Sequence, residues 1–233
     1  MYKKYTMPNG LRIVYEKIPY VRSVTIGIWV KTGSRNETPE NNGISHFIEH
    51  MMFKGTKNRT AKEIAASIDN IGGQLNAFTG KECTCYYTKT LDDRIDIAFD
   101  VLSDMLFNSN FAEEDIELEK NVILEELGMY EDSPEDLVHD ILSEKVWEGH
   151  SIGYPILGDQ KSLMSINREM ILDYINENYT PENTVIAVAG SIDEEKLKQL
   201  IEKKFGNWNT DTSRPERSSD ANFKPTVITR TQD

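Results

Sequence analysis

The stretch Gly43–Thr56, GISHFIEHMMFKGT, holds two histidines and a glutamate that could together do metal chemistry. On a helix, His46 and His50 project side by side, because positions four apart differ by about 40° around the axis. Two such imidazoles can chelate one zinc ion, and Glu49 can act as general base on the zinc-bound water. Histidines that meet the core by chance would leave the carboxylate between them unexplained. The pattern, H-x-x-E-H, therefore predicts a Zn²⁺-dependent metallopeptidase site.

A catalytic zinc site needs a third protein ligand and an open fourth position. The predicted helix 112–130 carries an arc of apolar residues, and we expect this arc to face the core. The arc comprises Ile116, Leu118, Val122, Ile123, Leu127, Met129 and Tyr130. Glu119 and Glu126 lie near its middle, where a carboxylate is costly unless it is paired or binds a cation. Either glutamate could be the missing ligand, and a salt bridge to a buried arginine is the alternative.

Strand and helix patterns surround these candidate ligands. The Asn9-Gly10 pair predicts a tight hairpin within 5–17, and β-branched and aromatic residues predict further strands. Thr60 and Glu63 form a capping-box pattern at the start of a helix. We expect strands within 23–34, 74–80, 82–91 and 182–190, and helices within 60–73, 92–107, 112–130, 134–147, 168–178 and 193–208. The histidine pair and the glutamate pair thus fall on two separate helices.

The stretch Gly43–Thr56 resembles the motif G-x-x-H-F-x-E-H-x-x-F-x-G-T of the pitrilysin and mitochondrial-processing-peptidase family of zinc peptidases, in its short, processing-peptidase-like branch. The third ligand in that family is a glutamate 76 residues after the second histidine, and 126 − 50 = 76 selects Glu126. The resemblance thus implies that His46, His50 and Glu126 bind the metal. A second glutamate recurs seven residues earlier, at Glu119, and is expected to orient a ligand or bind the substrate amine.

The same resemblance, which runs over nearly the whole chain, implies an α+β fold: an antiparallel sheet with helices packed on one face. It also implies a zinc-dependent endopeptidase that hydrolyses peptides or extended unfolded segments. The segment 72–87 resembles a substrate-holding N-A-x-T strand, so Asn76, Ala77, Phe78 and Thr79 are expected to bind peptide. The alternative is a non-catalytic partner subunit or peptide-binding module of the same fold. It is disfavoured because Glu49 and all three expected ligands are present.

Enzymes of this family have two similar halves, in one chain or in two subunits, and only one half carries zinc. The other half supplies an arginine and a tyrosine that hold the substrate carbonyl. The resemblance therefore predicts a zinc-bearing domain at 1–210, a linker at 211–222, and the truncated start of a second homologous half at 223–233. The expected partners are a peptide substrate and that second half, and a homodimer is also possible. Alone, the chain should be weakly active or inactive.

Composition excludes several other classes of protein. The formal net charge of −13 would repel a phosphate backbone, so we expect no nucleic-acid partner. The apolar runs are too short to span a membrane, and the N-terminus lacks the apolar region of a secretory signal. Cys83 and Cys85 are too close for an unstrained disulfide, which predicts free thiols in a reducing cytoplasm. His139 and His150 match no ligand spacing and are expected to be structural or surface residues.

Overall fold

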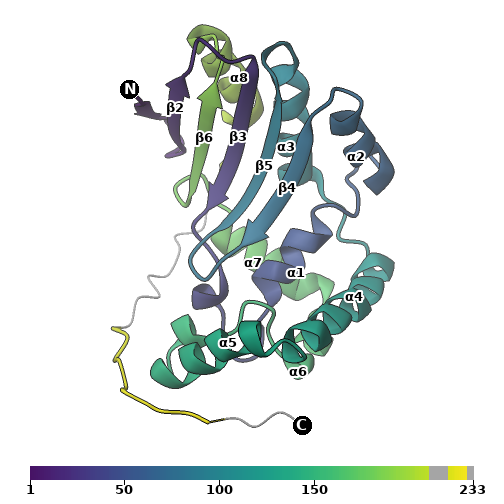
Figure 1. Ribbon diagram of the computed structural model, residues 1–233. Helices are drawn as coiled ribbons and strands as arrows, with labels where there is room; N and C mark the ends of the chain where they lie inside the picture. The colour runs from purple at the N-terminus through teal and green to yellow at the C-terminus, as the bar shows by residue number, and fades with distance from the viewer. Residues whose placement is uncertain (210–219, 230–233) are drawn as a thin grey trace.

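The computed structural model describes residues 1–209 and 220–229, and within them the central element is a six-stranded sheet with the order β1-β2-β6-β3-β5-β4 (Figure 1). The strands are β1 (Lys3–Thr6), β2 (Arg12–Lys17), β3 (Ser23–Val30), β4 (Gln74–Thr79), β5 (Thr84–Leu91) and β6 (Thr184–Gly190). Neighbouring strands run antiparallel, except that β2 and β6 are parallel. β4 forms one edge of this sheet.

Helices account for most of the remaining described chain. They are α1 (Ile44–Met51), α2 (Ala61–Asp69), α3 (Ile95–Asn108), α4 (Glu113–Glu131), α5 (Pro134–Val146), α6 (Gln160–Ser165), α7 (Arg168–Asn178) and α8 (Glu194–Phe205). Short 3₁₀ helices lie at η1 (Ser34–Asn36), η2 (Asp92–Arg94) and η3 (Ser151–Gly153). Figure 1 shows α3 and α8 behind the sheet, while α1 and α4 to α7 gather beyond the end of β4 and β5. The predicted α+β fold is confirmed.

One face of the sheet is buried, and the other face is open. Along β3, Val24, Ile26, Ile28 and Val30 are fully buried, whereas Thr25 and Trp29 on the opposite face are exposed. The large buried rings that pack in the same core are Phe47 of α1, Phe99 of α3 and Phe205 of α8. Each fully buried side chain of this size stabilises the fold by about 1.5–3 kcal/mol. The alternation along β3 therefore fixes which face of the sheet the helices cover.

Helix α1, which carries the histidine pair, begins at a glycine that the backbone requires. Gly43 has a φ of 93°, and a Cβ at this position would lie 2.6 Å from the carbonyl oxygen of Leu157. The buried carboxylate of Glu37 accepts hydrogen bonds from the Gly43 and Ser45 amides, at 2.8 and 2.9 Å. These amides belong to the first turn, where backbone N–H groups lack partners within the helix. Glu37 therefore fixes the orientation of α1 relative to the preceding loop.

Helix predictions are confirmed at α2 and need correction at α4. The expected capping box forms in α2, where Thr60 and Glu63 each bond the other's backbone. On α4, the prediction that the whole apolar arc faces the core is wrong, because Leu118, Val122 and Met129 are exposed. The buried residues of α4 are instead Ile116, Glu119, Lys120 and Ile123. The helix contacts α1, α5 and α6 along this narrower side, so part of the arc stays uncovered. The sequence patterns do not predict α6, whose six residues are too few for a clear periodicity.

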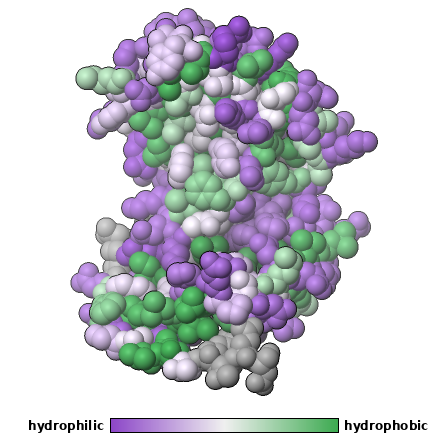
Figure 2. All heavy atoms as spheres, viewed as in Figure 1, coloured by the Kyte–Doolittle hydropathy of each residue, from purple (hydrophilic) through white to green (hydrophobic). Residues whose placement is uncertain are grey.

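Apolar side chains also gather at the surface over α5 (Figure 2). Val138 and Leu142 of this helix are exposed. The segment 220–229 passes nearby, since the Lys224 amide donates to the Val146 carbonyl at 3.0 Å. The ring of Phe223 packs edge-on against that of Trp147, with centroids 5.7 Å apart.

The predicted domain boundary lies largely outside the described residues. Of the predicted linker, 211–222, only 220–222 are described, and of the predicted second-half segment, 223–233, only 223–229. Residues 220–229 form neither helix nor strand, so the described part of the predicted second-half segment has no regular element. The linker and the start of a second half therefore stay predictions.

Three smaller expectations can be compared with the structure. Among residues 1–209 and 220–229, none of the helices combines the length and the apolarity that a membrane crossing needs. Cys83 and Cys85 are free thiols, as predicted, and burial raises the pKa of the Cys85 thiol to about 12. His139 is exposed on α5, and the His150 ring accepts a hydrogen bond from the Ile152 amide at 3.0 Å. Both histidines are therefore surface or structural residues.

Candidate metal centre

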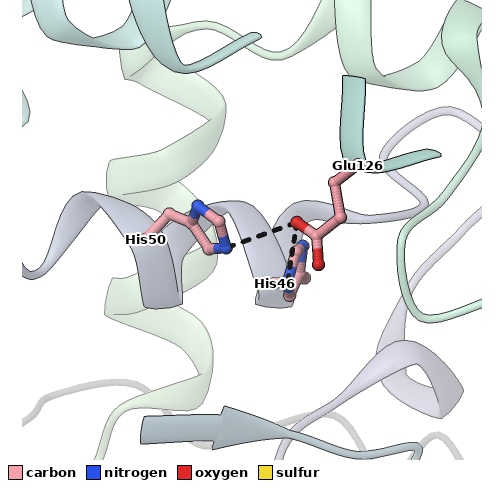
Figure 3. A group of neighbouring side chains, drawn as sticks. All are labelled: His46, His50 and Glu126. Carbon is pink, nitrogen blue, oxygen red and sulfur yellow. Dashed lines mark ion pairs between the residues drawn. The ribbon is translucent and has the colours of Figure 1, made fainter. Parts of the chain in front are cut away.

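Helices α1 and α4 meet so that His46, His50 and Glu126 point toward one another (Figure 3). The Nε2 atoms of His46 and His50 lie 3.9 and 3.7 Å from the same carboxylate oxygen, Oε2 of Glu126. The atoms through which the three residues could bind a metal all lie within 4.8 Å of one another. The structure thus brings together the three residues that the sequence predicts as ligands.

This group fits a zinc ion by its chemistry. It offers two imidazole nitrogens and one carboxylate oxygen, which are donors of catalytic zinc sites. The nitrogen–oxygen separations exceed the length of a hydrogen bond, so the three side chains do not satisfy one another. The side chains of His46, His50 and Glu126 are 11%, 24% and 42% exposed, so the group opens toward solvent on the α4 side. That opening suits a site that must also admit a substrate.

The environment of His46 favours the neutral ring that metals bind. Burial, and to a smaller extent the neighbouring His50 ring, lowers the pKa of His46 to about 4. Its Nδ1 is buried and has no hydrogen-bond partner within the described residues. The nitrogen that faces Glu126 is Nε2. His46 is therefore uncharged near neutral pH and presents one nitrogen to the group.

Glu119 lies behind His50 rather than among the candidate ligands. Its Oε1 accepts a hydrogen bond from Nδ1 of His50 at 2.8 Å, and its other oxygen pairs with Lys54. Burial raises the pKa of the Glu119 carboxyl, but the bonds from His50 and Lys54 outweigh burial and give a net lowering. A carboxylate at the far nitrogen of a histidine sets the nitrogen that faces a metal. Glu119 therefore turns Nε2 of His50 toward Glu126, and its counter-charge is a lysine rather than an arginine.

Glu49 stays outside the ligand group although it lies on the same turn of α1. The hydroxyl of Thr79, at the end of β4, donates to Oε2 of Glu49 at 2.5 Å. Burial raises the pKa of the Glu49 carboxyl, and the Thr79 hydrogen bond opposes this shift. A carboxylate that is near a metal but not bound to it can accept a proton from the attacking water.

Strand β4 runs beside α1 and, in the described sheet, pairs with β5 along one of its two edges. Its side chains alternate, so that Ala77 and Thr79 are partly buried toward α1 while Asn76 and Phe78 are exposed on the opposite face. Phe78 packs edge-on against Trp29, with ring centroids 5.4 Å apart. Of the four residues predicted to bind substrate, only Ala77 and Thr79 therefore turn their side chains toward the metal-binding helix.

Residues 12–160 match the family model described as insulinase, peptidase family M16. The chain belongs to the M16 peptidase family. Residues 165–233 match a second model, described as the peptidase M16 inactive domain.

Relatives of this M16 chain are named as zinc proteases. It is 55% identical over 208 residues to the uncharacterized zinc protease YmxG of Bacillus subtilis, and this alignment covers 89% of this chain and 51% of that protein. It is 43% identical over 202 residues to an uncharacterized zinc protease of Mycobacterium leprae, and this alignment covers 87% of this chain and 45% of that protein. The fold matches a protease from Helicobacter pylori with a TM-score of 0.90 at 23% identity, over 96% of this chain and 54% of that one. The chain thus spans about half the length of the curated relatives it matches.

The two matched segments of this M16 chain fold as one unit. β6, from the second segment, pairs with β2 and β3 from the first. The hydroxyl of Tyr174 on α7 forms hydrogen bonds of 2.8 Å with both Ser45 on α1 and Thr32. Part of the segment that matches the inactive domain therefore supports the helix that carries the histidines.

Sequence patterns miss two residues that support the centre, Glu37 and Lys54. Glu37 lies in a stretch that looks like an ordinary polar loop, yet it is buried against the start of α1. Lys54 reaches Glu119 across 65 positions, since 119 − 54 = 65. Lys54 lies beyond the end of α1 at Met51, so helical spacing from His50 does not signal this contact. Both contacts depend on tertiary packing, for which local periodicity has no signal.

Replacing Glu119 with glutamine should reduce peptide hydrolysis more than it reduces bound zinc. The charge that holds Nδ1 of His50 would be lost, while the three ligand atoms would remain. We expect hydrolysis to fall about 10–100-fold, with zinc content near one per chain when zinc is in excess. Metal analysis and a peptide-cleavage assay with the second half supplied measure both quantities, with Glu125→Gln on the exposed side of α4 as the control. Equal losses of zinc and activity would make Glu119 a ligand instead.

Proposed function

We propose that this chain is the zinc-binding part of an M16 endopeptidase that hydrolyses peptides or extended unfolded segments. One observation carries the proposal: on a single turn of α1, His46 and His50 face Glu126, while Glu49 bonds Thr79 instead. A site that only bound a metal would have no use for this separate carboxylate. The relatives named as zinc proteases support the same conclusion.

Each residue of the centre has a distinct part in the proposed reaction. His46, His50 and Glu126 would hold the zinc ion, which when bound acts as a Lewis acid that polarises the scissile carbonyl and activates water. Glu49 accepts the proton of the attacking water and passes it to the leaving amine. Glu119, paired with Lys54, keeps the His50 ring in the orientation that the site needs.

The edge strand β4 supplies a place for substrate. Its side away from β5 has unpaired backbone groups within the described sheet, and an extended peptide can add there as a further strand. Because Thr79 at the end of β4 touches Glu49, a peptide on this edge would run toward the candidate metal centre. Main-chain pairing recognises extended conformation more than side chains, so specificity should be broad and limited to unfolded segments.

In a complex with an uncleaved peptide, the peptide should pair with the main chain of Asn76 to Thr79. Hydrogen exchange provides the measurement, because the outward amides of β4 should become protected when peptide is added. The amides of β1, on the opposite edge of the sheet, provide the control and should not change. Protection at β1 but not at β4 would show that substrate binds elsewhere.

Chelation tests whether peptide cleavage depends on the bound metal. Peptide cleavage by the chain, assayed with the second half supplied, should stop on treatment with a chelator and return when zinc is added. His46→Ala should lose both bound zinc and cleavage, whereas His139→Ala, at an exposed position of α5, should keep both. Cleavage that persists in zinc-free protein would exclude the proposed function.

A further inference from the structure

The Glu49 carboxylate is held by one side chain from a different element. Thr79 Oγ1 donates to Oε2 of Glu49 at 2.5 Å, and across the described residues this is the single hydrogen bond that the carboxylate receives. The two residues lie 30 positions apart, on β4 and α1. The other carboxylate oxygen, Oε1, receives no hydrogen bond from residues 1–209 or 220–229.

Thr79 is well suited to fix a neighbouring group. A β-branched side chain is stiff about χ1, so its hydroxyl has a defined direction. The strand around it is also fixed, since Thr79 pairs with Thr84 of β5 and the Gly80 amide closes the hairpin onto the Cys83 carbonyl at 2.8 Å. Glu49, by contrast, has a flexible side chain whose rotamers cost free energy to restrict.

We infer that Thr79 is a positioning residue, which anchors one oxygen of Glu49 and leaves the other directed to accept the proton. This inference rests on the proposed function, because it assigns Thr79 to the base of that reaction. It also separates Thr79 from its predicted role in substrate binding. The hydroxyl of Thr79 is already committed to Glu49, so peptide bound to β4 would meet the main chain of Thr79 rather than its side chain.

Three substitutions distinguish positioning from substrate binding. Thr79→Val removes the hydroxyl and keeps the shape, Thr79→Ser keeps the hydroxyl, and Thr25→Val makes the same change on the exposed face of β3. Assayed with the second half supplied, Thr79→Val should lower kcat about 10–100-fold with KM and zinc content unchanged. Thr79→Ser should restore most of the rate, and Thr25→Val should behave like the wild type. A raised KM with unchanged kcat would make Thr79 a substrate contact and overturn the inference.

Crystal structures of the zinc-loaded chain supply a readout that does not depend on activity. In the wild type and in Thr79→Ser, the Glu49 carboxylate should occupy one position against the residue-79 hydroxyl. In Thr79→Val it should adopt other rotamers, while His46, His50 and Glu126 stay in place. An unchanged, single Glu49 position in Thr79→Val would overturn the inference. If no variant and not even the wild type cleaves peptide, the proposed function fails, and this comparison still decides the role of Thr79.

Discussion

Glu49→Gln should bind zinc like the wild type and lose nearly all peptide hydrolysis. Glutamine keeps the size of the side chain and can still bond Thr79, but it cannot accept a proton from water. Loss of a general base lowers the rate by about 10²–10⁴-fold. Zinc should stay bound, because Glu49 is not among the three residues whose ligand atoms converge. Zinc analysis, and single-turnover cleavage of an unfolded peptide with the second half supplied, measure the two effects.

The control for this experiment is Glu125→Gln, which removes one charge from an exposed position of α4 and should leave the rate unchanged. If Glu49→Gln cleaves peptide at close to the wild-type rate, Glu49 is not the base. If it instead loses its zinc, the carboxylate is a ligand, and the separation of roles along α1 is wrong.

Residues 1–233 alone should bind zinc but hydrolyse peptide very slowly, and a second half added in trans should raise the rate about 10²–10³-fold. The candidate ligands open toward solvent, with the Glu126 side chain 42% exposed. Within the described residues, the centre contains no arginine, and an arginine could stabilise the charge that develops on the substrate carbonyl. Removing one such stabilising donor typically costs about 10²–10³-fold in rate. Closure by a second half would also exclude water from the site.

The second half for this test is the remaining portion of a longer homologue, since the chain spans about half of its curated relatives. The rate should rise with the concentration of the added half and saturate, and an unrelated protein of similar charge should have no effect. A monomeric 233-residue chain with full activity would show that one half is sufficient.

The sequence predicts most of the fold because its local signals agree with one another. The Thr60 capping box, the Asn9-Gly10 turn and the β-branched strands each act over a few residues, and the structure has all of them. The H-x-x-E-H spacing likewise predicts a polar face on α1, because a helix alone sets the relative directions of those side chains.

The choice between Glu119 and Glu126 could not come from periodicity. The two carboxylates point in nearly the same direction on α4, but seven residues separate them by about 10 Å along the axis. The residue that reaches the histidines depends on where α4 crosses α1, which is a tertiary property. The family spacing selects Glu126. In the structure Glu126 lies beside His46 and His50, whereas Glu119 is hydrogen-bonded to the far nitrogen of His50.

Contacts between distant residues are the other part that local patterns do not contain. In the sequence, Glu37 is an ordinary loop residue and Thr79 an ordinary strand residue. Their hydrogen bonds to the start of α1 and to Glu49 form only in the folded chain. Some apolar side chains of α4 are exposed although the sequence pattern predicts them to be buried. An apolar arc predicts that some of its residues are buried, but the neighbouring helices decide which ones.

Anomalous diffraction at the zinc absorption edge would locate a bound metal without reference to activity. We expect one strong peak per chain, in contact with Nε2 of His46, Nε2 of His50 and the Glu126 carboxylate, with Glu49 close by but not bound. A peak elsewhere in the chain, or one bound by Glu119 in place of Glu126, would show that His46, His50 and Glu126 are not the zinc ligands.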